Sequence, residues 1–226
     1  MNHENFVRNI IKNVDSNGRV KCRERQDLEY KEKFGMNSLA KYAKSMASFA
    51  NNQGGYLIFG IRDNPREIIG VNDSFDSFQQ EKFTEQLNTT FSPEIEWECG
   101  KIEFDKFAIG FIYTHKSQSK PVVAVKTISS EKINDGDVYY RYRARSERIK
   151  YSELIKIIEE REKHEREGIL RLMETIKQSG TANLGIVNYN NGRFSTPNGV
   201  DIAVDRKIVS EVLRKAKYIK EGSFNE

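Results

Sequence analysis

A short segment near residue 30 carries acidic and basic side chains at a spacing suited to phosphodiester chemistry. It reads ERQDLEYKEKF over residues 24–34, and a strand through it would place Glu29 and Lys31 on one face. Carboxylates there could hold Mg²⁺ or Mn²⁺, while the lysine steadies the charge of a phosphate. The pair could equally be an exposed ion pair worth about 0–1 kcal/mol, and the spacing alone favours that simpler interpretation.

A second candidate is NNQGGYLIFGIRD, residues 51–63. Gly54 and Gly55 permit close backbone packing, and the apolar run 56–61 predicts a fully buried strand. Asp63 follows that strand; such an aspartate is usually a turn former, but strand ends in α/β sheets also carry binding chemistry. The glycines match neither common phosphate-loop pattern, so a nucleotide loop is not predicted.

A third candidate is the basic segment YYRYRARSERIK, residues 139–150. Strand parity would align Arg141, Arg143 and Arg145 into one basic edge, with tyrosines interleaved. Arginine can fork onto phosphates and aromatic rings can stack on bases, although a solvated charged strand end is an equally good interpretation. The predicted nucleic-acid-binding residues are Arg141, Arg143, Arg145 and Arg148 of this segment, with Lys120 from the preceding segment THKSQSKPV as a further contributor.

The elements that would position these side chains follow from hydrophobic periodicity and turn residues. Helices are predicted over 5–14, 38–51, 76–90, from 152 onward, 169–178 and 205–222, and strands over 28–34, 56–61, 95–99, 101–104, 107–113, 122–125 and 137–143. This alternation predicts an α/β fold with a mixed β-sheet and flanking helices. The predicted division is an N-terminal helix (1–20), a main domain (21–167) and a small α+β appendage (168–226).

Bulk composition adds little to these motifs. The chain has 226 residues and a formal net charge of +4, which is only weak support for a nucleic-acid partner. Cys22 and Cys99 form no disulfide framework, and no Cys/His spacing indicates zinc. The N-terminus lacks the features of a signal peptide and no apolar run is long enough to span a membrane, so a cytoplasmic protein is expected.

Taken together and in this order, the motifs resemble the Schlafen-type AlbA-like domain. The resemblance rests on LEYKEKF, SMASFANNQGGYLIFGIRD, KPV and DVYYRYRARS, and covers roughly residues 20–155. Its fixed positions include Asn51, Gly54, Gly55 and Gly60, together with Asp63. Arg143 stands where the pattern often has glycine, which makes this edge more basic than usual.

The resemblance implies an α/β fold that binds nucleic acid. In ribonuclease members of the family three acids cut tRNA and rRNA, and Glu24, Glu29 and Asp63 match them here, with Lys31 beside the second. The resemblance thus implies an Mg²⁺- or Mn²⁺-dependent endoribonuclease for structured RNA, with those acids as metal ligands and with stress or anti-phage defence as its expected setting. The alternative is a non-catalytic, DNA-binding regulatory module in which the acids serve structure.

Two further expectations come from the same comparison. The zinc-binding Cys/His residues of some members have no counterpart in this chain, so no structural zinc is expected. Vertebrate members carry two lobes that form a groove for RNA, and a homodimer of this chain could build an equivalent groove.

Overall fold

The computed structural model describes residues 2–179, 186–188, 193–195 and 201–203. Two compact units divide the chain, Met1–Glu162 and Lys163–Glu226. The first unit contains the helices α1 (His3–Lys12), α2 (Leu39–Ala50) and α3 (Gln80–Thr90) and the beginning of α4 (Tyr151–Ser179). It also contains single 3-10 turns at Met36–Ser38, Asp73–Phe75 and Ser129–Glu131. Its strands are β1 (Leu28–Lys31), β2 (Gly55–Phe59), β3 (Phe91–Ser92), β4 (Trp97–Phe104), β5 (Phe107–Thr114), β6 (Val123–Ala124), β7 (Tyr139–Tyr142) and β8 (Arg145–Arg148).

A mixed four-stranded sheet lies at the centre of the first unit, in the order β1-β2-β5-β4. β1 and β2 run parallel and are connected through α2, whereas β2, β5 and β4 pair antiparallel. Two smaller ladders join β3 to β6 and β7 to β8. The predicted α/β class with a mixed sheet is confirmed.

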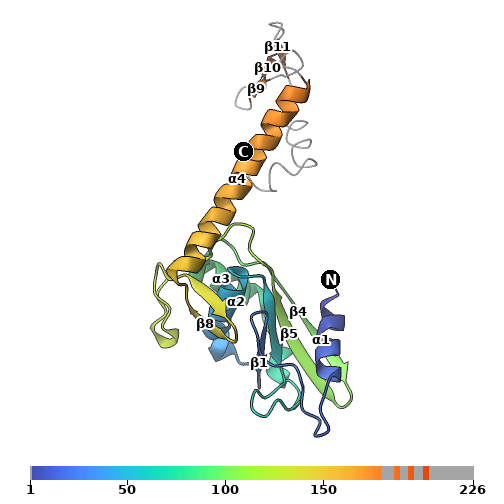
Figure 1. The fold of residues 1–226 in the computed structure, drawn as a ribbon. Helices are drawn as coiled ribbons and strands as arrows, with labels where there is room; N and C mark the ends of the chain where they lie inside the picture. Colours follow the sequence, from blue (N-terminus) through green and yellow to red (C-terminus); the bar gives the residue numbers. More distant parts are fainter. Residues whose placement is uncertain (1, 180–185, 189–192, 196–200, 204–226) are drawn as a thin grey trace. The chain divides into compact units, whose positions relative to one another are not determined.

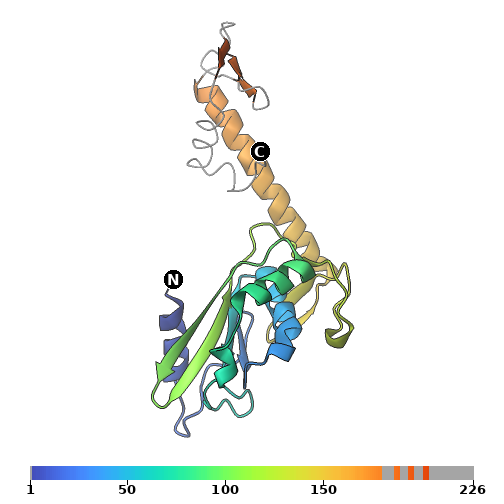
Figure 2. The same cartoon turned by 180° about the vertical axis from the view of Figure 1, so that it is seen from behind.

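Helices cover both faces of the sheet, which explains the apolar run in β2. Leu57 and Phe59 belong to the core cluster formed with α2 and α3, while Tyr56 and Ile58 belong to the cluster formed with α1. Figures 1 and 2 show α1 on one side of the sheet and α2 with α3 on the other. Every residue of β2 is buried because each side chain meets a helix layer.

Several predicted boundaries are wrong. The two strands predicted at 95–99 and 101–104 are one strand, β4, which pairs with β5 along its whole length. The strand predicted over 28–34 ends at Lys31, and α3 begins at Gln80 rather than 76. The helix predicted over 38–51 agrees with α2 within a residue at each end.

The second unit contains most of a long helix and a small sheet. α4 runs without a break over Tyr151–Ser179, so the interruption predicted at Gly168 is wrong. An antiparallel sheet follows in the order β11-β10-β9, from β9 (Ile186–Asn188), β10 (Arg193–Ser195) and β11 (Asp201–Ala203). The turn signals between these strands and the helix predicted over 205–222 fall outside the described residues.

Candidate nucleic-acid interface

The corner after α2 fixes the position of the basic segment. Asn51 is fully buried; its side-chain amide donates to the carbonyls of Val122 (2.8 Å) and Tyr139 (2.9 Å), and its Oδ1 accepts from the Val122 amide (2.7 Å). The next residue, Asn52, donates to the Arg141 carbonyl (3.1 Å). Both asparagines therefore bind the backbone of β7 to the end of α2.

The glycines of this corner are needed for steric reasons. Gly54 has φ +82°, and a Cβ there would come within 2.7 Å of the Thr114 carbonyl oxygen. A Cβ on Gly55 would meet the ring of Phe49 at 2.5 Å. The chain can therefore turn from α2 into β2 at this point only with two residues that lack side chains.

The basic segment is a β-hairpin rather than one strand. β7 and β8 pair antiparallel with Tyr142 opposite Arg145, and Arg143 stands in the turn between them with φ +53°. The strand parity predicted for Arg141, Arg143 and Arg145 is therefore wrong. Arg143, Arg145 and Arg148 are exposed, whereas Arg141 points into the protein and is only 1% exposed.

Arg141 forms the centre of a buried charge cluster. Its Nη1 lies 2.6 Å from Oε2 of Glu29, and Lys31 Nζ lies 2.5 Å from Oε1 of the same carboxylate. The shared face predicted for Glu29 and Lys31 is thus present, but Glu29 is buried rather than exposed. The predicted role of Arg141 as a surface phosphate ligand is wrong, because its guanidinium neutralises an internal carboxylate.

Lys120 was also predicted to bind phosphate and is likewise inaccessible. It is 8% exposed, and its Nζ donates to the Asn52 carbonyl at 2.5 Å. Burial and, to a lesser degree, the neighbouring Lys116 ammonium lower the pKa of Lys120 to about 8. Lys120 therefore supports the corner after α2 and contributes no accessible cation.

Glu24 and Asp63 lie close enough for their charges to interact. The Glu24 carboxylate accepts a hydrogen bond from the Tyr30 amide at 2.7 Å. Burial raises the pKa of Glu24, the Tyr30 amide lowers it, and the negative charges of Asp63 and Glu29 raise it again. Glu24 therefore lies within electrostatic range of both Asp63 and Glu29. Asp63 is exposed, while Glu24 is half-buried.

The acids do not form a metal site as they stand. Within the described part of the chain, no three carboxylate, imidazole or thiol side chains are grouped so that they could hold an ion. Both oxygens of Glu29 already face cations, Lys31 and Arg141. The arrangement does not fit the Mg²⁺ or Mn²⁺ site predicted for Glu24, Glu29 and Asp63, since hard divalent ions need several free oxygen ligands.

Two adjoining cavities flank the hairpin turn. One, of about 520 Å³, is lined by Glu24, Arg25, Gln26, Asp27, Gln53 and Arg143. The other, of about 620 Å³, is lined by Gln26, Tyr142, Arg143, Ala144, Arg145 and Glu147. Gln26 and Arg143 border both, so the hairpin turn and the loop before β1 enclose one continuous surface. Gln26 and Gln53 were missed by sequence reasoning, because an exposed glutamine carries no motif.

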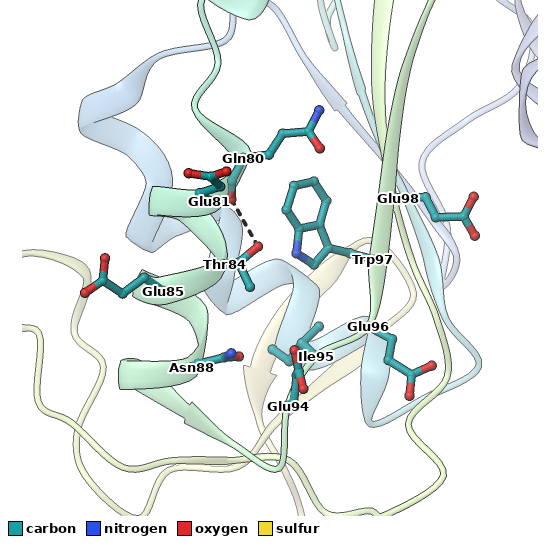
Figure 3. A pocket seen from close by; sticks show the side chains of 10 residues that line it. All are labelled: Gln80, Glu81, Thr84, Glu85, Asn88, Glu94, Ile95, Glu96, Trp97 and Glu98. Carbon is teal, nitrogen blue, oxygen red and sulfur yellow. Dashed lines mark hydrogen bonds between the residues drawn. The ribbon is translucent and has the colours of Figure 1, made fainter. Parts of the chain in front are cut away.

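A third cavity, of about 760 Å³, has only acidic residues among its charged lining residues. Figure 3 shows the indole of Trp97 lying between α3 and β4, with Glu81 and Glu85 on the helix and Glu98 pointing away on the other side of the strand. The glutamates lining it are Glu81, Glu85, Glu94, Glu96 and Glu98. A phosphate backbone would be repelled here, so the electrostatics favour the hairpin as the face for nucleic acid.

A comparison with protein-family models assigns the chain to a family. The chain belongs to the Schlafen AlbA_2 family, whose model matches residues 24–150, more than half of the sequence. Membership indicates a nucleic-acid-related function. The matched region contains every residue of the hairpin, the corner after α2 and the charge cluster around Glu29. In the described residues, no helix is long and apolar enough to cross a bilayer.

A particular relative covers nearly the whole sequence. An uncharacterized ATP-binding protein of Ureaplasma parvum is 47% identical over 238 aligned positions, which include 99% of this chain and 67% of that protein. Among solved structures, a Corynebacterium diphtheriae protein matches with 18% identity and a TM-score of 0.44, covering 63% of this chain and 29% of that one. The N-terminal domain of a RecG-related protein of Nitrosomonas europaea matches with 17% identity and a TM-score of 0.41, covering 67% of this chain and 97% of that domain.

Proposed function

We propose that this chain binds nucleic acid with the β7–β8 hairpin and the neighbouring loop at residues 24–27. One observation carries the proposal: Arg143 and Arg145 extend, exposed, beside two joined cavities, on a hairpin that buried asparagines hold in place. Arginines fixed in this way can fork onto phosphate oxygens at little entropic cost. Arg148 adds a third exposed guanidinium, although it also pairs with Asp137 at 2.8 Å.

Structured RNA such as tRNA is the proposed ligand, in keeping with the family resemblance; DNA is the alternative. Binding through phosphates would weaken as salt rises, and each lost contact would reduce the salt dependence by about one counterion. We expect Arg143→Gln with Arg145→Gln to weaken tRNA binding and to flatten its salt dependence. Fluorescence anisotropy at several salt concentrations measures both quantities.

A matched control separates the hairpin from overall charge. Lys106→Gln changes the net charge by the same amount per residue at an exposed position distant in sequence from the hairpin. The Lys106→Gln variant should bind tRNA like the parent protein. Equal weakening by the hairpin variants and the control, or a preference for duplex DNA over tRNA, would contradict the RNA-binding hairpin.

Metal-dependent cleavage of RNA is the second candidate function. The observation that favours it is the cavity that Glu24 and Arg143 line together, with Asp63 in electrostatic range of Glu24. It would require Glu29 to exchange one of its two partner cations for the metal ion. The test is incubation of total tRNA with the protein in Mn²⁺ or in EDTA, followed by a denaturing gel. Cleavage in Mn²⁺ that disappears in Asp63→Asn would support the endoribonuclease; intact tRNA in all lanes would reject it.

The Ureaplasma relative is described as ATP-binding, so a measurement of the melting temperature with and without ATP is a useful further test. This sequence has no phosphate-loop motif, so we expect ATP to leave the melting temperature unchanged. A concentration-dependent rise in the melting temperature with ATP would replace the nucleic-acid proposal by a nucleotide-binding one.

A homodimer is proposed as the form that would build a two-lobed groove. Light scattering coupled to gel filtration should give twice the mass of the chain at micromolar concentration. A monomer, with or without RNA, would contradict the dimer but leave the single-hairpin interface intact.

A further inference from the structure

Every acceptor position of the Glu29 carboxylate that faces the cluster is occupied by a donor of the chain itself. Oε1 accepts from Lys31 at 2.5 Å and from the Ser45 hydroxyl at 3.3 Å, while Oε2 accepts from Arg141 at 2.6 Å. Glu29 as a whole is 7% exposed, so water contributes little to the solvation of its carboxylate. Its charge is therefore compensated from within the protein.

Arg141 is equally well satisfied. Nη1 also donates to the Ser146 hydroxyl at 3.1 Å, Nη2 donates to the Leu28 carbonyl at 3.3 Å, and Nε donates to the Arg25 carbonyl at 3.4 Å. The guanidinium carbon lies 5.1 Å from the centroid of the Phe49 ring. Withdrawing this side chain would leave Oε2 of the buried Glu29 carboxylate without its partner and Lys31 as the one remaining cation of the described contacts, which is unfavourable.

From these contacts we infer that Arg141 is the resident cation of the acidic cluster, standing where a divalent metal ion would otherwise bind Glu29. It follows that nucleic-acid binding by this chain depends on the Glu29–Arg141 pair and needs no metal ion. The inference rests on the proposed nucleic-acid binding and gives Glu29 a positioning role in it.

The Glu29–Arg141 pair can influence nucleic-acid binding because it holds β7, the first strand of the hairpin, against the segment that carries Arg25 and Leu28. Arg141 lies in β7, two residues before the turn residue Arg143, and its guanidinium joins β7 to the loop and strand that carry Arg25 and Leu28. Those same two segments form the walls of the cavities beside Arg143. A buried carboxylate that cannot reach a ligand thereby sets where the exposed arginine stands.

The variant Glu29→Gln distinguishes a positioning role of Glu29 from a role as metal ligand. The positioning role predicts weaker tRNA binding even without metal, whereas a metal-ligand role predicts unchanged tRNA binding in EDTA. If Arg141 is the resident cation, Glu29→Gln weakens tRNA binding by roughly tenfold, and equally in EDTA and in Mn²⁺. The parent protein then binds tRNA with the same affinity in both buffers. Unchanged tRNA affinity of Glu29→Gln in EDTA would overturn the inference.

A titration without nucleic acid decides the metal question independently. Electron paramagnetic resonance of Mn²⁺ added to the parent protein should show only free ion. Tight Mn²⁺ binding by the parent that is lost in Glu29→Gln would overturn the inference, even if the protein binds no nucleic acid. Failure of the parent to bind tRNA or DNA would instead reject the proposed function, while this titration still tests Arg141 as the cation.

A milder variant guards against misfolding of Glu29→Gln. Ser146→Ala removes one hydrogen bond to Arg141 and one between the Ser146 and Ser48 hydroxyls, and it keeps both charges. We expect a smaller loss of tRNA affinity together with faster hydrogen exchange at the β7–β8 amides than in the parent. Unchanged exchange in the hairpin of a folded variant with weakened binding would show that the cluster does not position it.

Discussion

Arg143 combines an exposed guanidinium with a backbone conformation that side chains disfavour. Its φ of +53° lies in the left-handed region, where a non-glycine residue costs on the order of 1 kcal/mol. The sequence pattern of the family often has glycine at this position, which would satisfy the turn without strain. Retaining arginine here costs stability at the place where the proposed interface needs a cation.

At Arg143 we predict that one substitution increases the stability of the fold and weakens nucleic-acid binding. Arg143→Gly should raise the free energy of unfolding by about 1 kcal/mol, because the turn loses its strain. The same change should weaken tRNA binding and reduce the salt dependence by about one counterion. Chemical denaturation and anisotropy measure the two effects; a variant that is both less stable and equally tight in binding would contradict this account.

Lys120 offers a second test at the scale of one residue. Burial lowers the pKa of its ammonium from 10.5 to about 8, so the folded protein holds this proton less tightly than the unfolded chain does. Between pH 8 and pH 10.5 the unfolded chain binds more protons at this site. The contribution of Lys120 to the free energy of unfolding therefore rises with pH through that window and is constant below it.

We expect the parent protein to gain roughly 1–3 kcal/mol relative to Lys120→Met between pH 8 and pH 10.5. Urea unfolding of both proteins across this range measures the difference, and the tyrosines that titrate there are common to both. A constant difference at every pH would show that Lys120 keeps its ordinary pKa in the folded protein.

At the scale of elements, local pattern predicted what each segment becomes but not what it packs against. The apolar run of β2 and the periodicity of α2 were sufficient, because both signals lie within one element. The hairpin was missed because its turn contains no glycine or asparagine. Burial of Glu29 was missed because its partner Arg141 lies 112 residues away in the sequence.

The link between α2 and β7 is testable through Asn51. Replacing it with alanine removes three hydrogen bonds and leaves the Val122 and Tyr139 carbonyls buried without this donor. We expect a loss of roughly 2–5 kcal/mol in the free energy of unfolding. Asn88→Ala, at an exposed position of α3, is the control and should change it by less than about 0.5 kcal/mol. Similar losses in the two variants would contradict a structural role for Asn51.

At the scale of the whole molecule, the division into two units shows which part of the chain contains the buried core clusters. Both buried core clusters are composed of residues between Val7 and Tyr139, all within the first unit. The first unit therefore contains all the buried residues of these two clusters, on which the hairpin packs.

A chain ending at Glu162 should fold cooperatively and keep its tRNA affinity. Its melting temperature should lie within a few degrees of that of the full chain, because the core is unchanged. Thermal unfolding followed by circular dichroism, with anisotropy for binding, provides the test. Loss of cooperative unfolding would show that residues from Lys163 onward stabilise the first unit.

The glutamate-lined cavity around Trp97 and the arginines of the hairpin have a joint consequence for kinetics. The glutamates of that cavity and the exposed arginines of the hairpin lie at two separate places on one compact unit and give it an electric dipole. In the field of a polyanion such a dipole experiences a torque, which turns the arginines forward before contact and lowers the fraction of unproductive collisions. The glutamates around Trp97 would then accelerate association with RNA without ever touching it.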